Sequence, residues 1–426
     1  MKIVYLHQYY RTPEMAGGTR SYEFARRLVV EGHEVHVVTS DTEATAARPG
    51  TWRTSVEAGA TVHWAAVPYN NSMSYRNRIR AFLQFARSAA LRAAALEQDL
   101  VVATSTPLTI AIPAVYSARR RRVPMVLEVR DVWPEVPIAL GALRSPWSRW
   151  AACRLETWAY RNSRRVIALS PGMAQSIQRR FPDVPVTVVP NGCDRSLFAH
   201  ADESGTALRR TTPWLGDRPL VLYAGTLGYA NQVSYLVRMA AALRDSQPEI
   251  RFAIIGDGAE RRQTKALATD LGVLGRNLFM LDQMPKNDLV PYFAACDLTI
   301  ATFRDEPALH ANSANKVFDS WAAGRPVAVN FEGWIADTIR ESGAGVVLPA
   351  TDPDRAARLV ATFVADPHRT ANSRAAADRL ARETFDRDIL FDRFEQVLLD
   401  AAATNRPPAP DDGPLVASTA ASTPRR

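Results

Sequence analysis

The first forty residues alternate between apolar runs and polar segments in a pattern that predicts a strand, a loop, a helix and a second strand. Residues 3–6 and 35–38 are the two apolar runs. Between them lie Gly17 and Gly18, followed by a segment from Thr19 to Gly32 whose apolar residues recur at helical spacing. This order favours a parallel sheet, and ligands bind at the carboxyl ends of the strands of such sheets.

Short apolar runs continue along the chain and indicate two units of this kind. Further strands are predicted at residues 100–103, 123–129, 166–170, 186–189, 220–224, 252–255, 298–301 and 327–329. We therefore predict an α/β protein with two Rossmann-like, doubly wound domains at residues 1–198 and 218–384, joined by a polar linker at residues 199–217. An apolar stripe predicts a last helix at residues 385–403, and residues 404–426, rich in Pro, Ala, Ser and Thr, predict a disordered tail.

One predicted helix in the second half carries the strongest functional signal. It opens after Ser313 and ends at Gly324, with Lys316 in its first turn. The helix dipole disfavours a cation there unless an anion lies between the two, so a phosphate held by Lys316 and the free N–H groups of the helix start would fit. Asp319 and Ser320 follow on the same face, where a carboxylate could bind sugar hydroxyls. A solvated ion pair between Lys316 and Asp319 accounts for the same residues equally well.

A second candidate site follows the predicted strand at residues 123–129. Arg130, Asp131 and Glu135 come directly after it, and Glu128 lies at its end. A doubly wound sheet has its cleft at this edge. The alternative is a loop in which Arg130 and Asp131 form a structural ion pair.

The charge distribution adds a further feature to this picture. The net charge is +8, but residues 1–200 hold 26 Lys and Arg against 15 Asp and Glu, or +11, whereas residues 201–426 hold 26 against 29, or −3. A one-sided basic surface suits anionic lipid, nucleic acid or a phosphorylated substrate. The basic amphipathic helix predicted at residues 75–97 would either lie on an anionic membrane or pack on the core. We favour core packing, because its many alanines give little membrane affinity.

The cysteines and the first residues favour a reducing compartment. Cys153, Cys193 and Cys296 are widely separated and form neither a zinc motif nor a disulfide framework. No long apolar segment at the N-terminus resembles a signal peptide, and no charge-free apolar stretch is long enough to span a membrane. We expect a cytoplasmic protein, with peripheral attachment at the inner face of the plasma membrane as an open alternative.

Several motifs of this chain resemble one enzyme family. The segment NKVFDSWAAGRPV and the segment EVRDVWPE are similar to signatures of family 4 retaining glycosyltransferases with the GT-B fold, in the branch of bacterial L-fucosamine and colanic-acid transferases. GGTRSYEFARRLVVEGHEV, YAGTLG, IIGDGAER and PNGCDRSLF resemble other family segments. The resemblance implies that the two domains face each other across a cleft and that the last helix crosses back to the first domain. It also implies transfer of a sugar from a nucleotide diphosphate to a hydroxyl of a glycan, a lipid-linked saccharide or a small molecule. UDP is the favoured nucleotide, and an N-acetyl amino sugar is one candidate for the sugar.

The resemblance also implies roles for individual residues. Asp131 and Lys316 would be catalytic, and the acceptor would meet Glu128, Arg130, Trp133 and Glu135. The donor would meet Gly17, Gly18, Gly225, Thr226, Gly256, Gly258, Arg261, Ser313, Asn315 and Asp319. The expected partners are a nucleotide sugar and an acceptor hydroxyl, with an anionic membrane surface as a further candidate; nucleic acid is not expected.

No cofactor and no metal are expected. The pairs Asp352-x-Asp354 and Asp386-x-Asp388 have the spacing of a metal-dependent transferase site, but neither follows an apolar strand. We interpret both as structural and expect a mechanism without a metal.

Two departures from the family pattern are visible. The family's pair of glutamates eight residues apart falls on Ala311 and Asp319, and its basic pair after the strand at 220–224 falls on Thr226 and Asn231. Arg261, Arg262 or Lys265 would then have to compensate for the missing positive charges. Two other functions stay open: a nucleotide-sugar hydrolase or epimerase of the same fold, and a non-catalytic, membrane-associated binder of nucleotide sugars. A dehydrogenase is disfavoured, because no segment completes the G-x-G-x-x-G motif.

Overall fold

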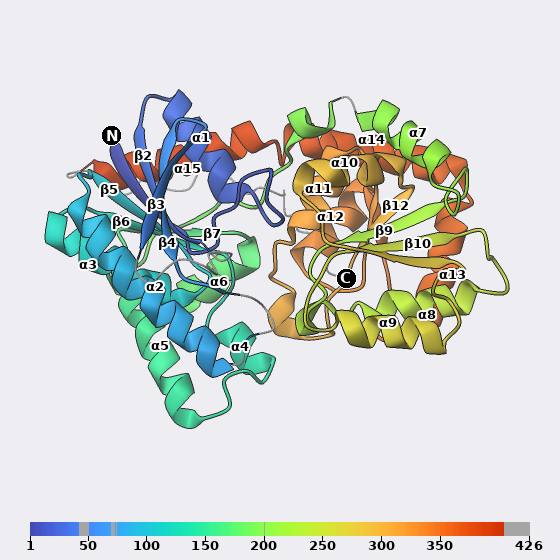
Figure 1. Cartoon of the computed structure of the whole chain (residues 1–426), viewed down its shortest axis with the longest axis horizontal. Coiled ribbons are helices and arrows are strands. Elements are labelled where there is room, and N and C mark those ends of the chain that lie inside the picture. The colour runs from blue at the N-terminus through green and yellow to red at the C-terminus, as the bar shows by residue number, and fades with distance from the viewer. Residues whose placement is uncertain (42–50, 70–72, 74, 200, 404–426) are drawn as a thin grey trace, which may run out of the picture.

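The computed structural model describes residues 1–41, 51–69, 73, 75–199 and 201–403. It contains two β-sheets that form two lobes lying side by side, with helices packed around each (Figure 1). The predicted α/β class with two Rossmann-like domains is confirmed. The predicted disordered tail, residues 404–426, lies outside the described residues.

The first sheet has eight strands in the order β3-β4-β2-β1-β5-β6-β7-β8. All neighbours are parallel except β3 and β4, which form an antiparallel hairpin at the edge and were not among the predicted strands. Ala58 and Gly59 make its turn with positive φ angles of 46° and 87°. The strands are β1 (Lys2–Leu6), β2 (Glu34–Asp41), β3 (Trp52–Glu57), β4 (Ala60–Ala66), β5 (Leu100–Thr104), β6 (Met125–Val129), β7 (Arg165–Ala168) and β8 (Val186–Val188).

The second sheet has six strands, all parallel, in the order β11-β10-β9-β12-β13-β14. Its order reverses between β9 and β12, the place where an open α/β sheet offers a crevice for a ligand. The strands are β9 (Leu220–Ala224), β10 (Arg251–Ile255), β11 (Leu278–Leu281), β12 (Leu298–Ala301), β13 (Val327–Val329) and β14 (Gly345–Val347).

Side chains alternate along the strands and form a core on each face of the sheets. In β1, Val4 and Leu6 join one core, whereas Ile3 and Tyr5 join the other. The helices that cover these faces are α1 (Arg20–Val30), α2 (Tyr75–Ala95), α3 (Ala111–Arg121), α4 (Glu135–Ala139), α5 (Pro146–Arg161), α6 (Pro171–Arg180), α7 (Ala201–Thr211), α8 (Ser234–Leu243), α9 (Arg261–Asp270), α10 (Lys286–Ala295), α11 (Asn315–Ala322), α12 (Trp334–Ser342), α13 (Pro353–Val364), α14 (Pro367–Glu383) and α15 (Arg387–Ala402). Short 3-10 turns occupy Leu108–Ile110, Arg195–Phe198, Tyr229–Asn231 and Pro307–Leu309.

The segment predicted as a linker contains a helix of the second domain instead. Helix α7 packs on α10 so closely that a Cβ on Gly205 would lie 2.8 Å from the Cβ of Ala294. Arg209 donates hydrogen bonds to the carbonyl of Ala295 and to Asp297. Residues 199–217 look polar because one side of α7 faces solvent, which corrects the linker prediction.

The chain crosses between the domains twice, and the two crossings run side by side. The N–H of Cys193 donates to the carbonyl of Phe385 at 2.7 Å, and the N–H of Arg387 donates to the carbonyl of Cys193 at 3.2 Å. Helix α14 lies on the second domain, whereas α15 returns to the first (Figure 1). There the ring of Phe394 packs 4.5 Å from that of Phe24. The predicted crossover helix is confirmed.

Helix α2 packs on the first domain as we predicted. Phe85 and Ala89 are buried in the core between α2 and the sheet, whereas Leu83 and Leu91 are exposed. Within the described part of the chain, no helix is both long and apolar enough to cross a membrane.

Replacing Phe394 with Ala is expected to lower the free energy of unfolding by about 3–5 kcal/mol, because it removes a fully buried ring between α15 and the first domain. Urea denaturation followed by circular dichroism measures this loss. Leu399→Ala on the same helix removes a side chain that is 40% exposed and should cost less than about 1 kcal/mol. Equal losses in the two variants would contradict the packing role of α15.

Candidate functional site

Lys316 lies in the first turn of α11, which follows β12 at the point where the order of the second sheet reverses. Its ammonium donates to the hydroxyl of Tyr223 at 3.1 Å and lies 4.3 Å from the centre of that ring. Burial lowers the pKa of Lys316 to about 7, because no carboxylate compensates for the lost hydration. An anion beside Lys316 would restore its charge.

Gly225 leaves room for the side chain of Lys316, because it has no Cβ. Its φ angle is +155°, and a Cβ there would lie 2.9 Å from Cε of Lys316. Only glycine combines this backbone conformation with this close approach. The predicted Thr226 lies beside it with an exposed side chain, and its carbonyl accepts the hydrogen bond of the Tyr223 hydroxyl at 2.7 Å.

The glycine loop after β10 packs against the loop that follows β9. A Cβ on Gly256 would lie 1.9 Å from the carbonyl oxygen of Gly225, and one on Gly258 would lie 2.5 Å from that of Leu227. Gly256 and Gly258 are therefore required by the contact between two loops. Their predicted contact with the donor stays a prediction.

Arg261, which was predicted to compensate for the missing basic pair, already has hydrogen-bond partners within the second domain. Its guanidinium donates to the carbonyls of Gly256 and Leu281 and to the carboxylate of Asp282, the last at 2.6 Å. It holds the glycine loop to the end of β11. Arg262 and Lys265 are exposed on α9.

The start of α11 contacts the first domain. The side-chain amide of Asn191 donates to the carbonyl of Ser313 at 2.6 Å, and the N–H of Asn191 donates to the Ser313 hydroxyl at 3.4 Å. A Cβ on Gly18 would lie 2.7 Å from Nδ2 of Asn315 and 3.7 Å from Nη2 of Arg130. The structure thus brings Gly18, Asn315 and Arg130 together at one place between the domains. Gly17 precedes them with a φ of +136°.

Asp131 and Trp133 follow β6 at the carboxyl edge of the first sheet. One carboxylate oxygen of Asp131 accepts the Thr106 hydroxyl at 3.0 Å, and the side chain is half-buried. Trp133 packs against the core of the domain. A half-buried carboxylate at this edge can accept a hydroxyl proton or hydrogen bond.

Glu128 does not face this edge. It is fully buried, and its two oxygens accept Arg20 at 2.8 Å and Thr104 at 3.0 Å. Arg20 also donates to the carbonyls of Val189 and Pro190, just before the first crossing. The predicted acceptor role of Glu128 is corrected: both oxygens are already used within the domain.

Glu135 begins α4 and points toward α6. It accepts the Ser176 hydroxyl at 2.9 Å and pairs with Arg180 at 3.1 Å. Arg180 also pairs with the buried Glu156. The predicted acceptor residue thus belongs to a local ion network, which leaves Arg130, Asp131 and Trp133 as the members of that motif beside the domain interface.

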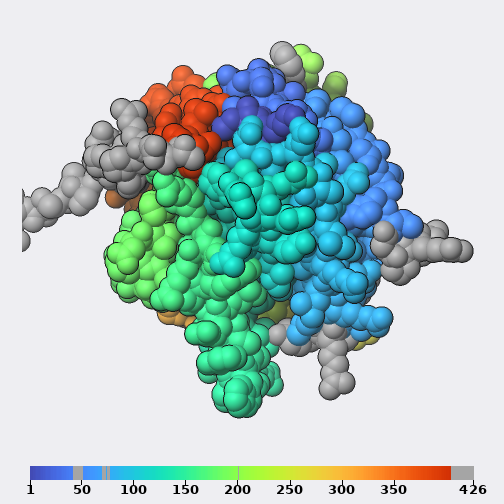
Figure 2. Space-filling view, turned by 90° about the vertical axis from the view of Figure 1, so that its left-hand side faces the viewer, coloured from blue at the N-terminus to red at the C-terminus, as the bar shows by residue number. Residues whose placement is uncertain are grey.

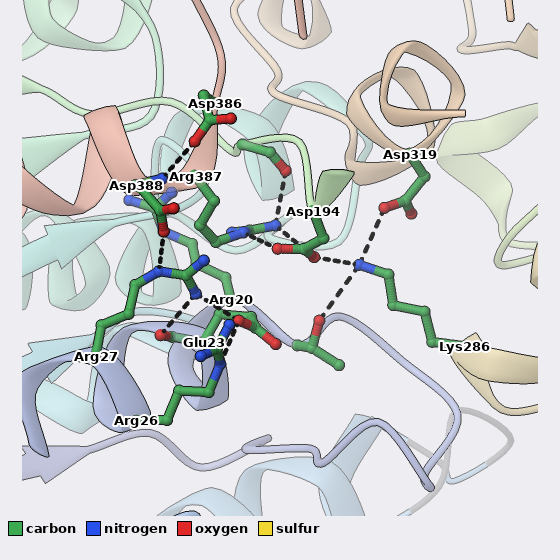
Figure 3. A network of polar contacts seen from close by, with 12 residues as sticks. Arg20, Glu23, Arg26, Arg27, Asp194, Lys286, Asp319, Asp386, Arg387 and Asp388 are labelled. Atoms are coloured by element: carbon green, nitrogen blue, oxygen red, sulfur yellow. Dashed lines mark hydrogen bonds and ion pairs between the residues drawn. The ribbon is translucent and has the colours of Figure 1, made fainter. Parts of the chain in front are cut away.

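Asp319, one turn after Lys316, takes part in a network that joins the domains (Figure 3). Lys286 at the start of α10 reaches Asp319 at 3.0 Å, Asp194 at 2.6 Å and the Thr19 hydroxyl at 3.4 Å. The ribose role predicted for Asp319 stays a prediction, and one of its oxygens is already bound by Lys286.

Ala311 occupies the position of the missing glutamate. Its carbonyl accepts the Ser170 hydroxyl at 2.6 Å, and its Cβ lies 3.2 Å from the place where a Cβ on Gly172 would be. The segment before α11 therefore rests directly on the start of α6.

Two Asp-x-Asp pairs are structural, as predicted. Asp352 accepts the N–H of Arg355 and Asp386 accepts that of Asp388, so each caps a helix. Among the described residues, no cluster of His, Cys, Asp and Glu side chains has the arrangement of a metal site.

His7 is a site residue that the sequence analysis did not single out. It follows β1 at the carboxyl edge, is buried, and its Nδ1 has no partner within the described part of the chain. Burial, with the charges of Arg130 and Arg11, holds its pKa well below the ordinary value. Its position directly after the first strand was the available signal.

The chain matches two family models. One, described as a glycosyl transferase 4-like domain, matches residues 16–192, and the other, glycosyl transferases group 1, matches residues 206–384. The putative colanic acid biosynthesis glycosyl transferase WcaI of Escherichia coli is 24% identical over 402 residues, which cover 90% of this chain and 96% of that protein. The GDP-mannose-dependent alpha-(1-6)-phosphatidylinositol monomannoside mannosyltransferase of Mycolicibacterium smegmatis is 27% identical, with coverage of 63% and 67%.

Solved structures show the same architecture. Anabaena Alr3699/HepE in complex with UDP and glucose has a TM-score of 0.69 at 18% identity, covering 94% of this chain and all of that one. WaaG, a glycosyltransferase involved in lipopolysaccharide biosynthesis, has a TM-score of 0.69 at 17% identity, covering 93% and 99%. Because the two family models together match most of the sequence, the chain belongs to the family 4 glycosyltransferases, with the GT-B fold.

Proposed function

We propose that the protein is a retaining, metal-independent glycosyltransferase that moves a sugar from a nucleotide diphosphate donor to a hydroxyl group of a saccharide acceptor. The observation that carries the proposal is the desolvated ammonium of Lys316 at the N-terminus of α11, beside Gly225 and without a carboxylate partner. Such a site attracts the diphosphate that departs from the sugar.

The chemistry needs charge stabilisation at the leaving group and an oriented acceptor. Lys316 and the N–H groups of α11 would supply the positive charge as the bond from the anomeric carbon to the phosphate oxygen breaks. In a front-face reaction the acceptor oxygen bonds to the same face of that carbon, and its proton passes to the leaving phosphate. Asp131 would orient the acceptor hydroxyl, so no protein nucleophile is required.

The donor proposed is a UDP-sugar, with an N-acetyl amino sugar favoured by the motif resemblance. HepE, of the same fold, binds UDP in its solved complex, whereas the mycobacterial relative is named for GDP-mannose. Both nucleotides therefore belong in the first binding experiment. The acceptor proposed is a lipid-linked saccharide, because the matched relatives include proteins named for colanic acid and lipopolysaccharide core biosynthesis.

A lipid-linked acceptor requires access to a membrane. The N-terminal end of α5 exposes side chains that suit contact with a membrane. This end projects from the first domain (Figure 2), and Trp147 and Trp150 there are 78% and 59% exposed. Their rings meet edge to face, and the guanidinium of Arg154 lies 5.9 Å from Trp150. Exposed tryptophans with neighbouring arginines suit the interface of an anionic bilayer, so we propose this end of α5 as the membrane contact.

Binding of UDP or GDP is expected to weaken about tenfold per pH unit between pH 8 and 9, because Lys316 with a pKa near 7 must take up a proton to pair with the diphosphate. Titration calorimetry in two buffers of different ionisation enthalpy should show uptake of about one proton per nucleotide at pH 8. In Lys316→Met the uptake should vanish. Affinity that does not change across this pH range would contradict the role of Lys316.

Asp131→Asn is expected to lower kcat by about 10²- to 10⁴-fold while leaving the donor Kd unchanged, because it removes the group that orients the acceptor. The measurement is acceptor-dependent release of nucleoside diphosphate, without added metal. Asp183→Asn changes an exposed carboxylate in the same domain and serves as the control. Release that is equally fast without any acceptor would favour a hydrolase instead.

The double variant Trp147→Ala and Trp150→Ala should bind phosphatidylglycerol-containing vesicles about tenfold more weakly in a co-sedimentation assay, a loss of roughly 1.4 kcal/mol. Turnover of a soluble acceptor should not change. Tyr116→Ala, which removes another exposed aromatic ring of this domain, is the matched control. If the double variant sediments like the wild type, the membrane contact lies elsewhere.

A further inference from the structure

We propose that Arg130, from the first domain, clamps the donor diphosphate and replaces the basic pair that Thr226 and Asn231 no longer supply. The inference rests on the proposed function and changes the role of Arg130 from acceptor binding to donor binding. The diphosphate would then be held by both domains, with Lys316 on one side and Arg130 on the other.

The placement of the guanidinium is the first argument. Arg130 follows β6, and its Nη2 lies 3.7 Å from the point that a Cβ on Gly18 would occupy. Nδ2 of Asn315, the first residue of α11, lies 2.7 Å from the same point. The guanidinium of Arg130 therefore lies close to the start of α11, the helix whose first turn carries Lys316.

The unpaired state of this guanidinium is the second argument. The side chain is half-buried, and no carboxylate or carbonyl accepts a hydrogen bond from it within the described part of the chain. The neighbouring Arg20 differs from Arg130 because each nitrogen of its guanidinium has an acceptor, provided by Glu128 and two backbone carbonyls. Its N–H groups are therefore free to donate to the oxygens of a bound anion, and hydrogen bonds between two charged groups are the strong ones.

The charges around Arg130 are the third argument. His7 is buried beside Arg130, and both Arg130 and Arg11 contribute to keeping its imidazole neutral. Asp131, the nearest carboxylate in sequence, accepts a hydrogen bond from Thr106. His7 and Gly18 therefore lie beside the positive charge of Arg130 at the interface between the domains.

The second domain by itself leaves a charge deficit at the diphosphate. Thr226 and Asn231 are neutral, and Arg261 is bound to two carbonyls and Asp282. Lys316 provides one positive charge for a leaving group that carries about two negative charges. Arg130 supplies the second positive charge from the first domain, so the leaving group is stabilised from both sides of the domain interface.

The test compares Arg130→Gln with the wild type by titration calorimetry, using UMP, UDP, GMP and GDP. Loss of a charge-assisted contact to the distal phosphate should weaken diphosphate binding by about 10- to 100-fold and leave monophosphate binding within about twofold. Arg130→Lys should recover part of the difference. Arg120→Gln, an exposed arginine at the end of α3, is the matched control and should behave as wild type.

Each outcome has a defined meaning. An unchanged ratio of diphosphate to monophosphate affinity in a folded Arg130→Gln protein overturns the inference while leaving the proposed function intact. A rise in acceptor KM alone also overturns it and restores the acceptor role. Wild-type protein that binds neither UDP nor GDP overturns the proposed function, and the inference with it. If Arg130→Gln fails to fold, the ratio measured for Arg130→Lys decides: a lowered ratio supports the inference, and a wild-type ratio overturns it.

Discussion

The mutual position of the two domains depends on one buried carboxylate, Asp194, at the first chain crossing. It receives Arg387, from the second crossing, and Lys286, from the start of α10, as Figure 3 shows. Burial alone would raise the pKa of Asp194, but the two cations outweigh it and hold the pKa well below its usual range. Removing Asp194 would leave the buried guanidinium of Arg387 without its carboxylate partner, a change that costs several kcal/mol in proteins. The crossings are thus fixed by charge as well as by the backbone hydrogen bonds of Cys193.

Lys286 connects the buried ion pairs of Asp194 to the candidate site. The same ammonium that pairs with Asp194 contacts Asp319 of α11 and the hydroxyl of Thr19, the residue before α1. The start of α1 and the middle of α11 are therefore tied to one cation. Gly18, directly before Thr19, is brought beside Asn315 as a result. Helix α11 and the glycine loop of the other domain thus meet beside the two chain crossings.

The sequence predicted what is local and missed what depends on distant partners. The strands, the helix that carries Lys316 and the returning last helix have periodic apolar patterns, and the structure confirms them. The hairpin of β3 and β4 was not predicted because its outer strand has no buried position and carries no apolar run. Helix α7 was taken for a linker because the residues that bury its inner face, in α10, lie some 80 positions later.

Some predicted site residues were also misinterpreted, because their contacts come from residues far away in the sequence. Glu128 looks like an active-site carboxylate next to Asp131, and only Arg20, 108 positions away, shows that its charge is already used. Gly256 and Gly258 look like a ligand loop, but the backbone they accommodate belongs to the loop after β9. Gly225 lies beside Lys316, the residue that defined the site, and its predicted contact with the donor stays a prediction.

Ala311, just before α11, takes part in the same interface between the domains. Ser170 caps α6 by accepting the N–H of Met173 and donates its own proton to the carbonyl of Ala311. The Cβ of Ala311 lies 3.2 Å from the position that a Cβ on Gly172 would take, so small residues at both positions let the segment before α11 pack directly on the start of α6. This contact, like the one between Gly18 and Asn315, depends on small residues at the place where the two domains meet.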